Sequence, residues 1–427
     1  MFMGWCNHIK EERIMKKVST ERELLERIQG SQIMLVECKR TANVMTRYLK
    51  GQGLLEQVAG VLLAPRSKGR NSYQGIPCRK MKRAELIPGC ICLVVELWED
   101  YHQVALDELE KLGADNVVLV DYELFADISR RENPKLDFMC VGFTKCGTTS
   151  LNNAFRMNEE IRMPKGKETF YLHWRNSYEN APERFYQKYF SDMPEGVLRG
   201  NVEPSYHVSA RGVYECFGKD IKLLFMVREP VGATFSYYKM LMRRPRKMDY
   251  VDYYKRHKKY STEIFSEFMR DKIYSEEIDR FQYDRWIEQY LKFFSRDQIK
   301  IVVFEDLLRD TKRVMDEIQD FIGVKNKLVY EELPHSNDGS SVSRGYLSAY
   351  INFKYYWAIR NRKENTELSF KQKKFLDFAK WAQKYTTVEN NEKVTPQQRA
   401  ELQEFYRPSV KRLGELLGRD MEKFWFK

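Results

Sequence analysis

The sequence predicts an α/β protein with two domains, each built on a parallel sheet flanked by helices. Short apolar runs typical of buried parallel strands alternate with amphipathic helical segments over the first third of the chain. Further along, two apolar runs each end in a short loop that leads straight into a helix. A chain of 427 residues also exceeds what one hydrophobic core usually serves. We therefore expect a small α/β domain followed by a larger one.

The small α/β domain is predicted over residues 31–130, after a helical leader over residues 1–30. In the leader, Thr20 and Glu23 have the spacing of a capping box, and Gly30 can end the helix. The expected strands are Ile33–Val36, Val61–Leu63, Leu93–Leu97 and Val117–Val120, with helices near Val44–Leu49 and Val104–Leu112. The domain resembles small Rossmann-like modules of bacterial glycan-modifying proteins. Its first strand-to-helix turn, ECKRTAN, lacks the glycines with which a backbone approaches a pyrophosphate, so we expect a docking or scaffolding domain.

The composition predicts a soluble chain with anionic partners. No stretch approaches the ~20 uninterrupted apolar residues of a membrane-spanning helix, and charged residues interrupt the N-terminus where a signal peptide would need an apolar region. The eight cysteines form no CxxC pair and lack a matching histidine spacing, which predicts no metal site and reduced thiols in the cytoplasm. The formal charge of +12 favours a nucleic acid, an acidic membrane surface, a phosphorylated cofactor or an acidic glycan.

The larger domain is predicted over residues 136–427, after a polar boundary at 128–137, and it opens with a candidate phosphate loop. Residues 138–151 read FMCVGFTKCGTTSL, an apolar strand, a loop with two glycines and a helix start, which together aim backbone N–H groups at an anion. The expected contacts are Lys145, Cys146, Gly147, Thr148, Thr149 and Ser150. The glycine spacing imitates a Walker A loop, but Thr148 stands where that loop has its lysine.

A second candidate phosphate site lies in IKLLFMVREPVGATFSYY, residues 221–238. This buried strand ends in Arg228 and turns through Pro230, which is well placed at a helix start. The strand end delivers a guanidinium and the helix presents the hydroxyl of Ser236, so both can hold one phosphate. The two loops occur about eighty residues apart, each at a strand-to-helix turn.

The two loops together resemble the nucleotide site of sulfotransferases that use 3′-phosphoadenosine-5′-phosphosulfate (PAPS), in particular the carbohydrate and heparan-sulfate type. K-x-G-T-T-x-L, from Lys145 to Leu151, is similar to the family's 5′-phosphosulfate loop, with Thr144 in place of the usual proline. R-x-P-x5-S-x-Y, from Arg228 to Tyr238, is similar to its 3′-phosphate motif. The resemblance covers nearly all of residues 138–427. It implies a P-loop-like domain, PAPS as sulfuryl donor, 3′,5′-adenosine bisphosphate as product, and no metal.

The resemblance also implies catalytic residues. Residues 162–174, RMPKGKETFYLHW, resemble the family's K-E-x-x-F-F segment, which makes Glu168 the general base that removes the acceptor's proton. Lys145 would neutralise charge growing on the leaving bisphosphate. Lys167 and Tyr206 are expected on the substrate side, the latter within GNVEPSYH, residues 200–207. Asn201 and Glu203 replace common family residues there, so this segment does not specify the acceptor.

Further contacts are expected late in the chain. Residues 336–347, SNDGSSVSRGYL, occupy the place where relatives close over the nucleotide, which makes Ser343, Arg344 and Gly345 candidate nucleotide contacts. Residues 239–259 concentrate basic side chains, including Arg243 and Arg244, among tyrosines, and a second aromatic group follows at 355–357. We interpret these as a cleft for an anionic glycan or glycolipid acceptor, because arginine pairs with carboxylate or sulfate.

Two other functions fit parts of the sequence. A nucleotide kinase with an irregular phosphate loop is disfavoured by the missing Walker lysine, the lack of a clear magnesium-binding carboxylate at a strand end, and the Arg228 to Ser236 motif. A nucleic-acid-binding protein is suggested by charge alone, and no basic region has groove-reading spacing. Transfer of a sulfuryl group to a hydroxyl or amine, with a carbohydrate as the expected acceptor, accounts for both phosphate motifs.

Overall fold

The computed structural model describes residues 15–38, 41–65, 71–97, 102–131, 135–172, 189–190, 196–257, 262–273, 275–334, 341–360 and 370–426. Parts of six segments named above lie outside these ranges, namely residues 1–14, 39–40, 132–134, 173–174, 258–259 and 336–340. The chain forms two compact units. The N-terminal unit comprises Met1–Leu136 with Thr169–Met193 and Arg211–Ile221, and the C-terminal unit comprises Asp137–Glu168, Pro194–Ala210 and Lys222–Lys427.

The N-terminal unit is built on a seven-stranded sheet in the order β1-β7-β6-β2-β3-β5-β4, parallel except where β4 pairs with β5. Its strands are β1 (Met15–Val18), β2 (Ile33–Glu37), β3 (Val58–Leu63), β4 (Ser72–Tyr73), β5 (Ile76–Lys80), β6 (Ile91–Val95) and β7 (Val117–Val120). The four strands predicted from apolar runs are confirmed as β2, β3, β6 and β7. Every residue of β2, β6 and β7 is buried, as expected for parallel strands covered on both faces.

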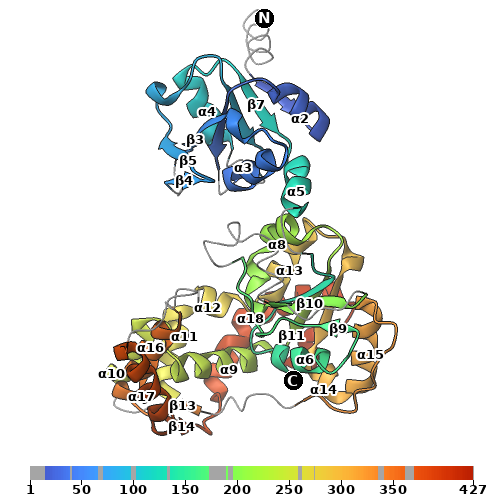
Figure 1. The fold of residues 1–427 in the computed structure, drawn as a ribbon. Helices are drawn as coiled ribbons and strands as arrows, with labels where there is room; N and C mark the ends of the chain where they lie inside the picture. The colour runs from blue at the N-terminus through green and yellow to red at the C-terminus, as the bar shows by residue number, and fades with distance from the viewer. Residues whose placement is uncertain are drawn as a thin grey trace, which may run out of the picture. The chain divides into compact units, whose positions relative to one another are not determined.

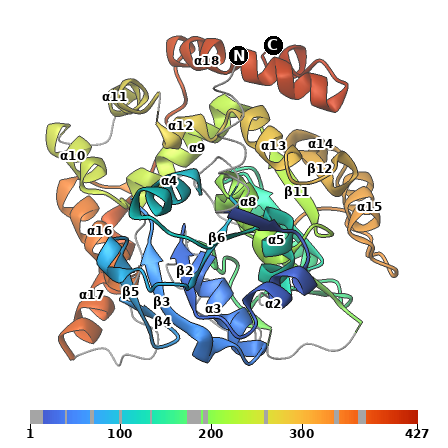
Figure 2. The ribbon, with the colours of Figure 1, turned by 90° about the horizontal axis from the view of Figure 1, so that it is seen from above.

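The helices of this unit are α2 (Glu21–Ile28), α3 (Thr41–Gly51), α4 (Gln103–Leu112) and α5 (Tyr122–Arg131). In Figures 1 and 2, α4 lies on the opposite side of the sheet from α2 and α3. The capping box predicted at the start of α2 is present, since the Glu23 N–H donates to Thr20 Oγ1 at 3.2 Å and the Thr20 N–H donates to Glu23 Oε2 at 3.1 Å. Strand β1 was not predicted. The described part of the predicted helical leader therefore contributes both a strand and a helix to the sheet unit.

One helix of the N-terminal unit comes from much later in the sequence. Helix α8 (Ala210–Phe217) stacks Tyr214 on Tyr122 of α5 with ring centroids 6.4 Å apart, and the Tyr214 hydroxyl donates to Glu123 Oε2 at 2.8 Å. The Arg130 guanidinium lies 5.4 Å from the centre of the Tyr214 ring. Residues Arg211–Ile221, which lie between β10 and β11 in the sequence, thus belong to the N-terminal unit. A single boundary along the sequence does not separate the two units.

The C-terminal unit is built on a five-stranded parallel sheet in the order β12-β11-β8-β10-β9. The strands are β8 (Phe138–Gly142), β9 (Ile161–Arg162), β10 (Leu198–Val202), β11 (Lys222–Val227) and β12 (Ile299–Val303). In the register of the central pair, Phe225 of β11 lies opposite Gly142 of β8. Because the two strands are parallel neighbours, the loops after their carboxyl ends lie side by side, and the Phe143 N–H donates to the Met226 carbonyl at 2.9 Å.

Helices surround this sheet and extend beyond it (Figure 1). They are α6 (Thr148–Phe155), α9 (Pro230–Arg243), α10 (Met248–Arg256), α11 (Thr262–Lys272), α12 (Glu276–Asp279), α13 (Tyr283–Leu291), α14 (Phe304–Arg309), α15 (Thr311–Ile322), α16 (Tyr346–Arg360), α17 (Phe370–Thr386), α18 (Pro396–Leu417) and α19 (Met421–Trp425). A short antiparallel pair joins β13 (Ser341–Ser343) to β14 (Thr387–Glu389). Among the described residues, no helix is both long and apolar enough to cross a bilayer. The predicted α/β class with a helix-flanked parallel sheet is confirmed for both units.

Candidate active site

The loop between β8 and α6 is shaped to hold an anion. Gly147 has a φ of +86°, and a Cβ placed on it would lie 2.5 Å from the Phe304 ring, so only glycine fits there. Helix α6 begins at Thr148, and its N-cap residue is Gly147, which has no side chain with which to cap the first turn. The first N–H groups of a helix have no partner inside it, so this end is suited to a phosphate or sulfate.

Cys146 differs in detail from its predicted role as a phosphate contact. Its side chain is buried, with Sγ 3.6 Å from the Tyr283 hydroxyl, and its N–H donates to the Phe143 carbonyl at 3.3 Å. Burial raises the pKa of this thiol to about 12, so it is a neutral group below the loop. The structure therefore gives Cys146 a supporting role, because its own amide is used to close the loop.

The second strand-to-helix turn brings Arg228 to the same place. Its Nη1 donates to the Lys145 carbonyl at 3.2 Å, and its guanidinium lies 5.2 Å from the centre of the Phe304 ring. The guanidinium also passes 3.8 Å from the point where a Cβ on Gly232 would sit, at the first turn of α9. Ser236, half-buried, lies one helical turn beyond Gly232 on the same face. The structure thus joins the two motifs that the sequence presents eighty residues apart.

The helix N-terminus at this second turn is already occupied. The Glu229 carboxylate accepts hydrogen bonds from the N–H groups of Val231 at 3.2 Å and Gly232 at 2.7 Å. Burial raises the pKa of Glu229 by more than these hydrogen bonds lower it, so the pKa lies above its usual value. A phosphate bound here would be held by the side chains of Arg228 and Ser236, because the helix N–H groups are already bonded.

Lys145 stands at the centre of a group of cations. Its pKa is lowered to about 8, first by burial and then by the positive charges of Arg243, Arg228 and Lys167. A bound anion would be attracted by these positive charges and would stabilise the protonated form of Lys145. We call Lys145, Lys167, Arg228 and Arg243 the cation cluster, and it comes from four separate segments: the phosphate loop, the segment before residue 169, the end of β11 and the end of α9.

The predicted base lies beside the phosphate loop. Lys167 Nζ is 3.2 Å from Thr148 Oγ1 and 3.3 Å from Glu168 Oε1, so it links the carboxylate to the first residue of α6. The side chains of Lys167 and Glu168 are 23% and 31% exposed, which leaves the carboxylate accessible to a ligand. Among the described residues, Glu168 Oε2 has no recorded hydrogen bond, and this oxygen is suited to accept a proton.

Of the predicted acceptor residues, Arg243 takes a different place. It belongs to the cation cluster around Lys145, and its Nη1 donates to Ser341 Oγ at 3.4 Å. Arg244 is exposed. The neighbouring Arg246 lies 5.7 Å from the centre of the Tyr356 ring, and the Trp357 indole N–H donates to the Arg246 carbonyl at 3.1 Å. The basic segment after α9 and the later aromatic group therefore form one surface.

Two predicted contacts are buried in supporting positions. Ser343 is 0% exposed, and its hydroxyl donates to the Arg243 carbonyl at 3.2 Å and accepts from Asn352 Nδ2 at 3.0 Å. Tyr206 is also 0% exposed, in the 3-10 helix Pro204–Val208, and its carbonyl accepts from the Tyr290 hydroxyl at 2.6 Å. A ligand at the surface reaches neither side chain. Ser343 instead fixes the end of α9, and so the position of Arg243.

Arg344 and Gly345 follow Ser343 at the end of β13. Arg344 is exposed, and its N–H donates to the Thr386 carbonyl at 2.8 Å, while the Gly345 carbonyl accepts from the Ala349 N–H at 2.9 Å at the start of α16. Because the Arg344 side chain is exposed, it can reach a ligand at the surface. A nucleotide contact by these residues stays a prediction.

Two residues of the site were not predicted from the sequence. The Tyr283 hydroxyl donates to the Arg228 carbonyl at 2.8 Å and faces Cys146, so it ties the two loops together, and burial raises its pKa. Phe304 lies against both Gly147 and the Arg228 guanidinium. Neither belongs to a motif. The only signal for Phe304 was its place directly after the buried run IKIVV, where a parallel strand must end at the same edge as β8 and β11.

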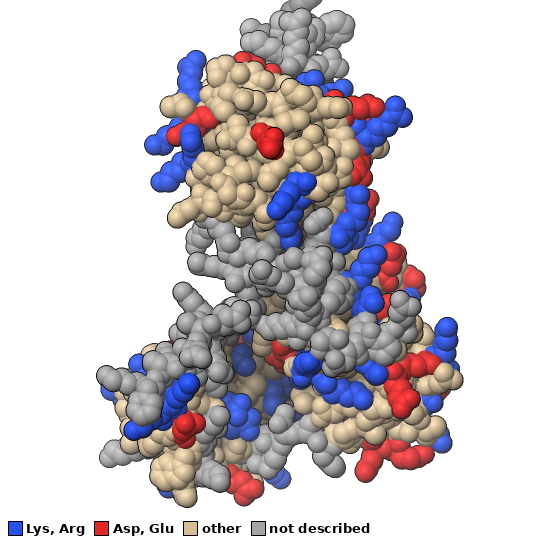
Figure 3. Space-filling view, in the orientation of Figure 1, with Lys and Arg blue, Asp and Glu red and all other residues tan. Residues whose placement is uncertain are grey.

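Figure 3 shows Lys and Arg side chains in a hollow of the C-terminal unit, between its sheet and the helices beyond α9.

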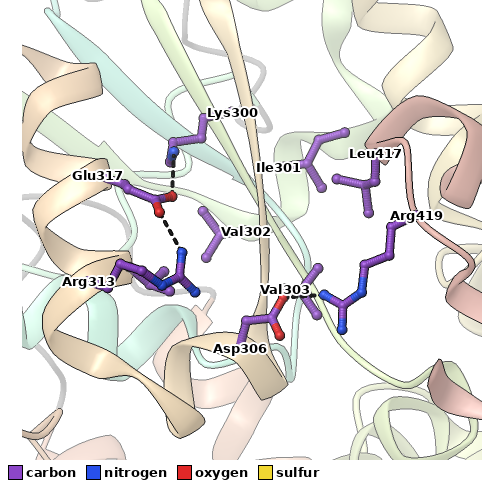
Figure 4. A pocket seen from close by; sticks show the side chains of 10 residues that line it. Lys300, Ile301, Val302, Val303, Asp306, Arg313, Glu317, Leu417 and Arg419 are labelled. Carbon is purple, nitrogen blue, oxygen red and sulfur yellow. Dashed lines mark hydrogen bonds and ion pairs between the residues drawn. The ribbon is translucent and has the colours of Figure 1, made fainter.

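A separate cavity of about 200 Å³ lies at the edge strand β12 (Figure 4). Its three cations have acidic partners, since Lys300 and Arg313 both contact Glu317 and Arg419 contacts Asp306. This second cavity has the weaker case for an anion site. Within the described ranges, no three His, Cys, Asp or Glu side chains are placed to hold a metal ion.

A family model described as the sulfotransferase domain matches residues 135–416, which is more than half of the chain. The chain belongs to the sulfotransferase family. A curated relative, heparan sulfate glucosamine 3-O-sulfotransferase 3B1 of Mus musculus, is 26% identical to this sulfotransferase over 195 residues. That alignment covers 43% of this chain and 45% of the relative, so the chain spans less than half of the relative's length.

Solved structures of sulfotransferases are also similar to this one. The sulfotransferase from Alicyclobacillus acidocaldarius is 21% identical, with a TM-score of 0.42 and coverage of 69% of this chain and 99% of that chain. The mouse sulfotransferase SULT7A1, solved in complex with PAP, is 12% identical, with a TM-score of 0.32 and coverage of 71% and 93%.

Proposed function

We propose that this sulfotransferase takes the sulfuryl group of PAPS and transfers it to a hydroxyl or amine of a carbohydrate acceptor. One observation carries the donor half of the proposal. Lys145, with a pKa lowered to about 8, lies among Arg228, Arg243 and Lys167 beside the open N-terminus of α6. Cations gathered at an uncapped helix end favour a ligand with several negative charges, and PAPS carries such charges at both ends of its ribose.

The two loops divide the donor between them. The 5′-phosphosulfate would lie at the first turn of α6, against the N–H groups and Lys145, with Gly147 allowing close approach. The 3′-phosphate would lie against Arg228 and Ser236 on α9, since Glu229 takes the N–H groups of that helix. The hydrogen bond from Arg228 to the Lys145 carbonyl fixes the spacing of the two halves.

Transfer needs one base and one stabilised leaving group. The acceptor's oxygen or nitrogen forms a bond to sulfur while the bond from sulfur to the bridging oxygen breaks, and its electron pair stays on the bisphosphate. Glu168 accepts the acceptor's proton, held in place by Lys167 at 3.3 Å. Lys145 neutralises the charge that grows on the departing oxygen, an electrostatic contribution that needs no rearrangement during the reaction.

The acceptor class rests on two supports. The similar mouse protein is named for glucosamine in heparan sulfate, an anionic glycan. In this chain, the exposed Arg244 and the Arg246 to Tyr356 contact place cations and aromatic rings on one surface after α9. Such a surface fits a carbohydrate that carries carboxylate or sulfate groups. The expected cytoplasmic location stays a prediction.

Transfer from ³⁵S-labelled PAPS tests this function directly. Polysaccharides, oligosaccharides, glycolipids and small phenols are offered in parallel, and we expect label in at least one carbohydrate and in no phenol. Glu168→Gln should reduce transfer by about 10²-fold or more while binding of 3′,5′-adenosine bisphosphate is kept. Phosphate transfer from ATP with magnesium, and no sulfate transfer, would instead support the kinase.

The acceptor surface has its own test. Arg244→Glu with Arg246→Glu should raise the acceptor's KM and leave affinity for the bisphosphate unchanged, because neither residue belongs to the cation cluster. Lys411→Glu on α18, also an exposed cation, is the matched control. If the acceptor's KM is the same in both variants, this surface does not bind the acceptor.

A further inference from the structure

Helix α17 exposes three large aromatic side chains. Phe378, Trp381 and Tyr385 are 50%, 60% and 61% exposed. Among the side chains of α17 that the structure describes, the buried ones are smaller, namely Leu376, Ala382 and Thr386 at 9%, 5% and 6% exposure. The spacing of the three aromatic residues places them on one helix face, beside the buried one. In Figures 1 and 2, α17 lies at the outside of the C-terminal unit next to α16.

The three aromatic residues form one continuous strip, which we call the aromatic ridge. Ring centroids of Phe378 and Trp381 are 6.0 Å apart, and those of Trp381 and Tyr385 are 5.2 Å apart. Single exposed apolar side chains are common, but a contiguous exposed strip of large ones marks an interaction site. The ring planes are inclined to their neighbours by 34° and 51°, so the ridge does not offer a row of parallel ring faces for successive sugars.

The charge of α17 selects the kind of partner. In sequence, the helix contains five lysines, Lys371, Lys373, Lys374, Lys380 and Lys384, and one acidic residue, Asp377. Lys374 is exposed and lies four residues before Phe378, on the ridge face. A second copy of the chain would bring two such positive helices together, and a purely apolar groove would offer no negative charge to this positive helix. A surface that is both anionic and apolar underneath meets both needs.

We propose that α17 docks the protein on an anionic lipid bilayer. The aromatic ridge enters the boundary between headgroups and acyl chains, where Trp and Tyr are favoured, and the exposed Lys373 and Lys374 meet the lipid phosphates. Each lysine near an anionic surface strengthens binding, and salt screens this contribution. The resulting association is peripheral and reversible, and it does not depend on the identity of the enzyme's substrates.

Vesicle co-sedimentation tests the proposal. The full-length protein is mixed with phosphatidylcholine vesicles that contain or lack phosphatidylglycerol. We expect partitioning to be about tenfold or more stronger on the anionic vesicles, and to fall as salt rises. The ridge variant, Phe378→Ser with Trp381→Ser and Tyr385→Ser, should lose most of this binding. The control variant, Leu308→Ser with Val329→Ser, removes apolar residues that are 59% and 67% exposed elsewhere and should bind as the wild type does.

Two further measurements keep the outcome interpretable. Stabilisation by 3′,5′-adenosine bisphosphate, unchanged in the ridge variant, shows that the variant is folded and that failure of docking is separate from failure of the proposed enzyme function. Tryptophan emission should shift to the blue on binding, and Trp381→Phe should reduce that shift while still binding. Equal vesicle binding by the wild type and the ridge variant would overturn the proposal. So would a dimer that the ridge variant abolishes, together with no vesicle binding by the wild type.

Discussion

Both units of the molecule have a buried parallel strand that leads into a helix, but the two turns have opposite electrostatics. In the N-terminal unit, β2 ends in Glu37, which is 0% exposed, and its carboxylate accepts from the Ala42 N–H at 2.9 Å in the first turn of α3. In the C-terminal unit, the N-terminus of α6 has no such cap from Gly147, and the cation cluster lies beside it. A helix end attracts anions only where the protein has left it uncapped.

The capping of each helix end indicates where a ligand can bind. A carboxylate at the first turn of α3 already stabilises the helix dipole, so that turn has no need of a phosphate. The turn into α9 resembles α3 in this respect, because Glu229 caps it, and there the side chains of Arg228 and Ser236 must provide the binding site instead. Three similar turns therefore have three different roles, and the difference comes from one or two side chains in each.

Removing Lys145 should have the largest effect. Lys145→Met takes the central charge out of the cation cluster, and we expect kcat/KM for sulfate transfer to fall by about 10²- to 10³-fold. Lys50→Met, which changes an exposed lysine at the end of α3, is the matched control and should not alter transfer. Steady-state kinetics with labelled PAPS measures both. Wild-type rates in Lys145→Met would show that the open helix end does not need this charge.

Gly147→Ala should reduce the stability of the C-terminal unit more than Gly113→Ala reduces the stability of the N-terminal unit. The added Cβ would lie 2.5 Å from the Phe304 ring at a φ of +86°. We expect a loss of stability of more than about 2 kcal/mol, with loss of bisphosphate binding. Gly113→Ala, at the end of α4, has a similar φ of +76° but open space around it, and should cost only about 1–2 kcal/mol. Thermal unfolding of the two variants compares these losses.

Glu37→Ala tests the other side of the comparison. It leaves the buried N–H of Ala42 without its acceptor, so we expect the N-terminal unit to lose about 1–3 kcal/mol of stability. Glu37→Gln keeps a carbonyl acceptor and should lose less. Neither variant should change the Kd for 3′,5′-adenosine bisphosphate measured by calorimetry. A weaker Kd in either one would mean that this helix end takes part in nucleotide binding after all.

The pH dependence of binding should follow Lys145. Its pKa in the free protein is about 8, and a bound anion favours the charged form, so the Kd should rise above pH 8 by up to about tenfold per pH unit. Lys145→Arg keeps its charge through this range, and its Kd should stay flat. The same shift from the usual 10.5 makes this group's contribution to folding stability rise between pH 8 and 10.5 in the free protein. Equal pH slopes for both proteins would assign the titration to another group.

Local features of both units followed from the sequence. Apolar runs located β2, β8 and β11, and Gly147 and Pro230 marked the turns after two of them, because backbone conformation at such positions depends on neighbouring residues alone. The capping of α9 by Glu229 has the same local origin, but nothing in the pattern of residues favours that role over an exposed acid. The helix of Tyr214 and the strand Met15–Val18 depend on distant partners and were missed.

Contacts between distant segments in the site could not be predicted from the sequence, because the fold brings these segments together. Arg243 was assigned to the acceptor surface because it stands among basic residues, yet the length of α9 and the anchor from Ser343 bring it to Lys145. Tyr206 was assigned to the substrate side because GNVEPSYH resembles the family's substrate-side segment, but the 3-10 helix there buries its side chain. Tyr283 and Phe304 act through contacts with residues tens of positions away, which one sequence does not reveal.

The two phosphate sites can be tested together by calorimetry with two nucleotides. We predict that 3′,5′-adenosine bisphosphate binds at least about tenfold more tightly than adenosine 5′-monophosphate, because Arg228 and Ser236 hold the second phosphate. Arg228→Ala should remove most of this difference, with the weaker nucleotide affected least. Equal binding of the two nucleotides by the wild type, or tighter binding of ATP with magnesium, would contradict the claim that these loops form a PAPS site.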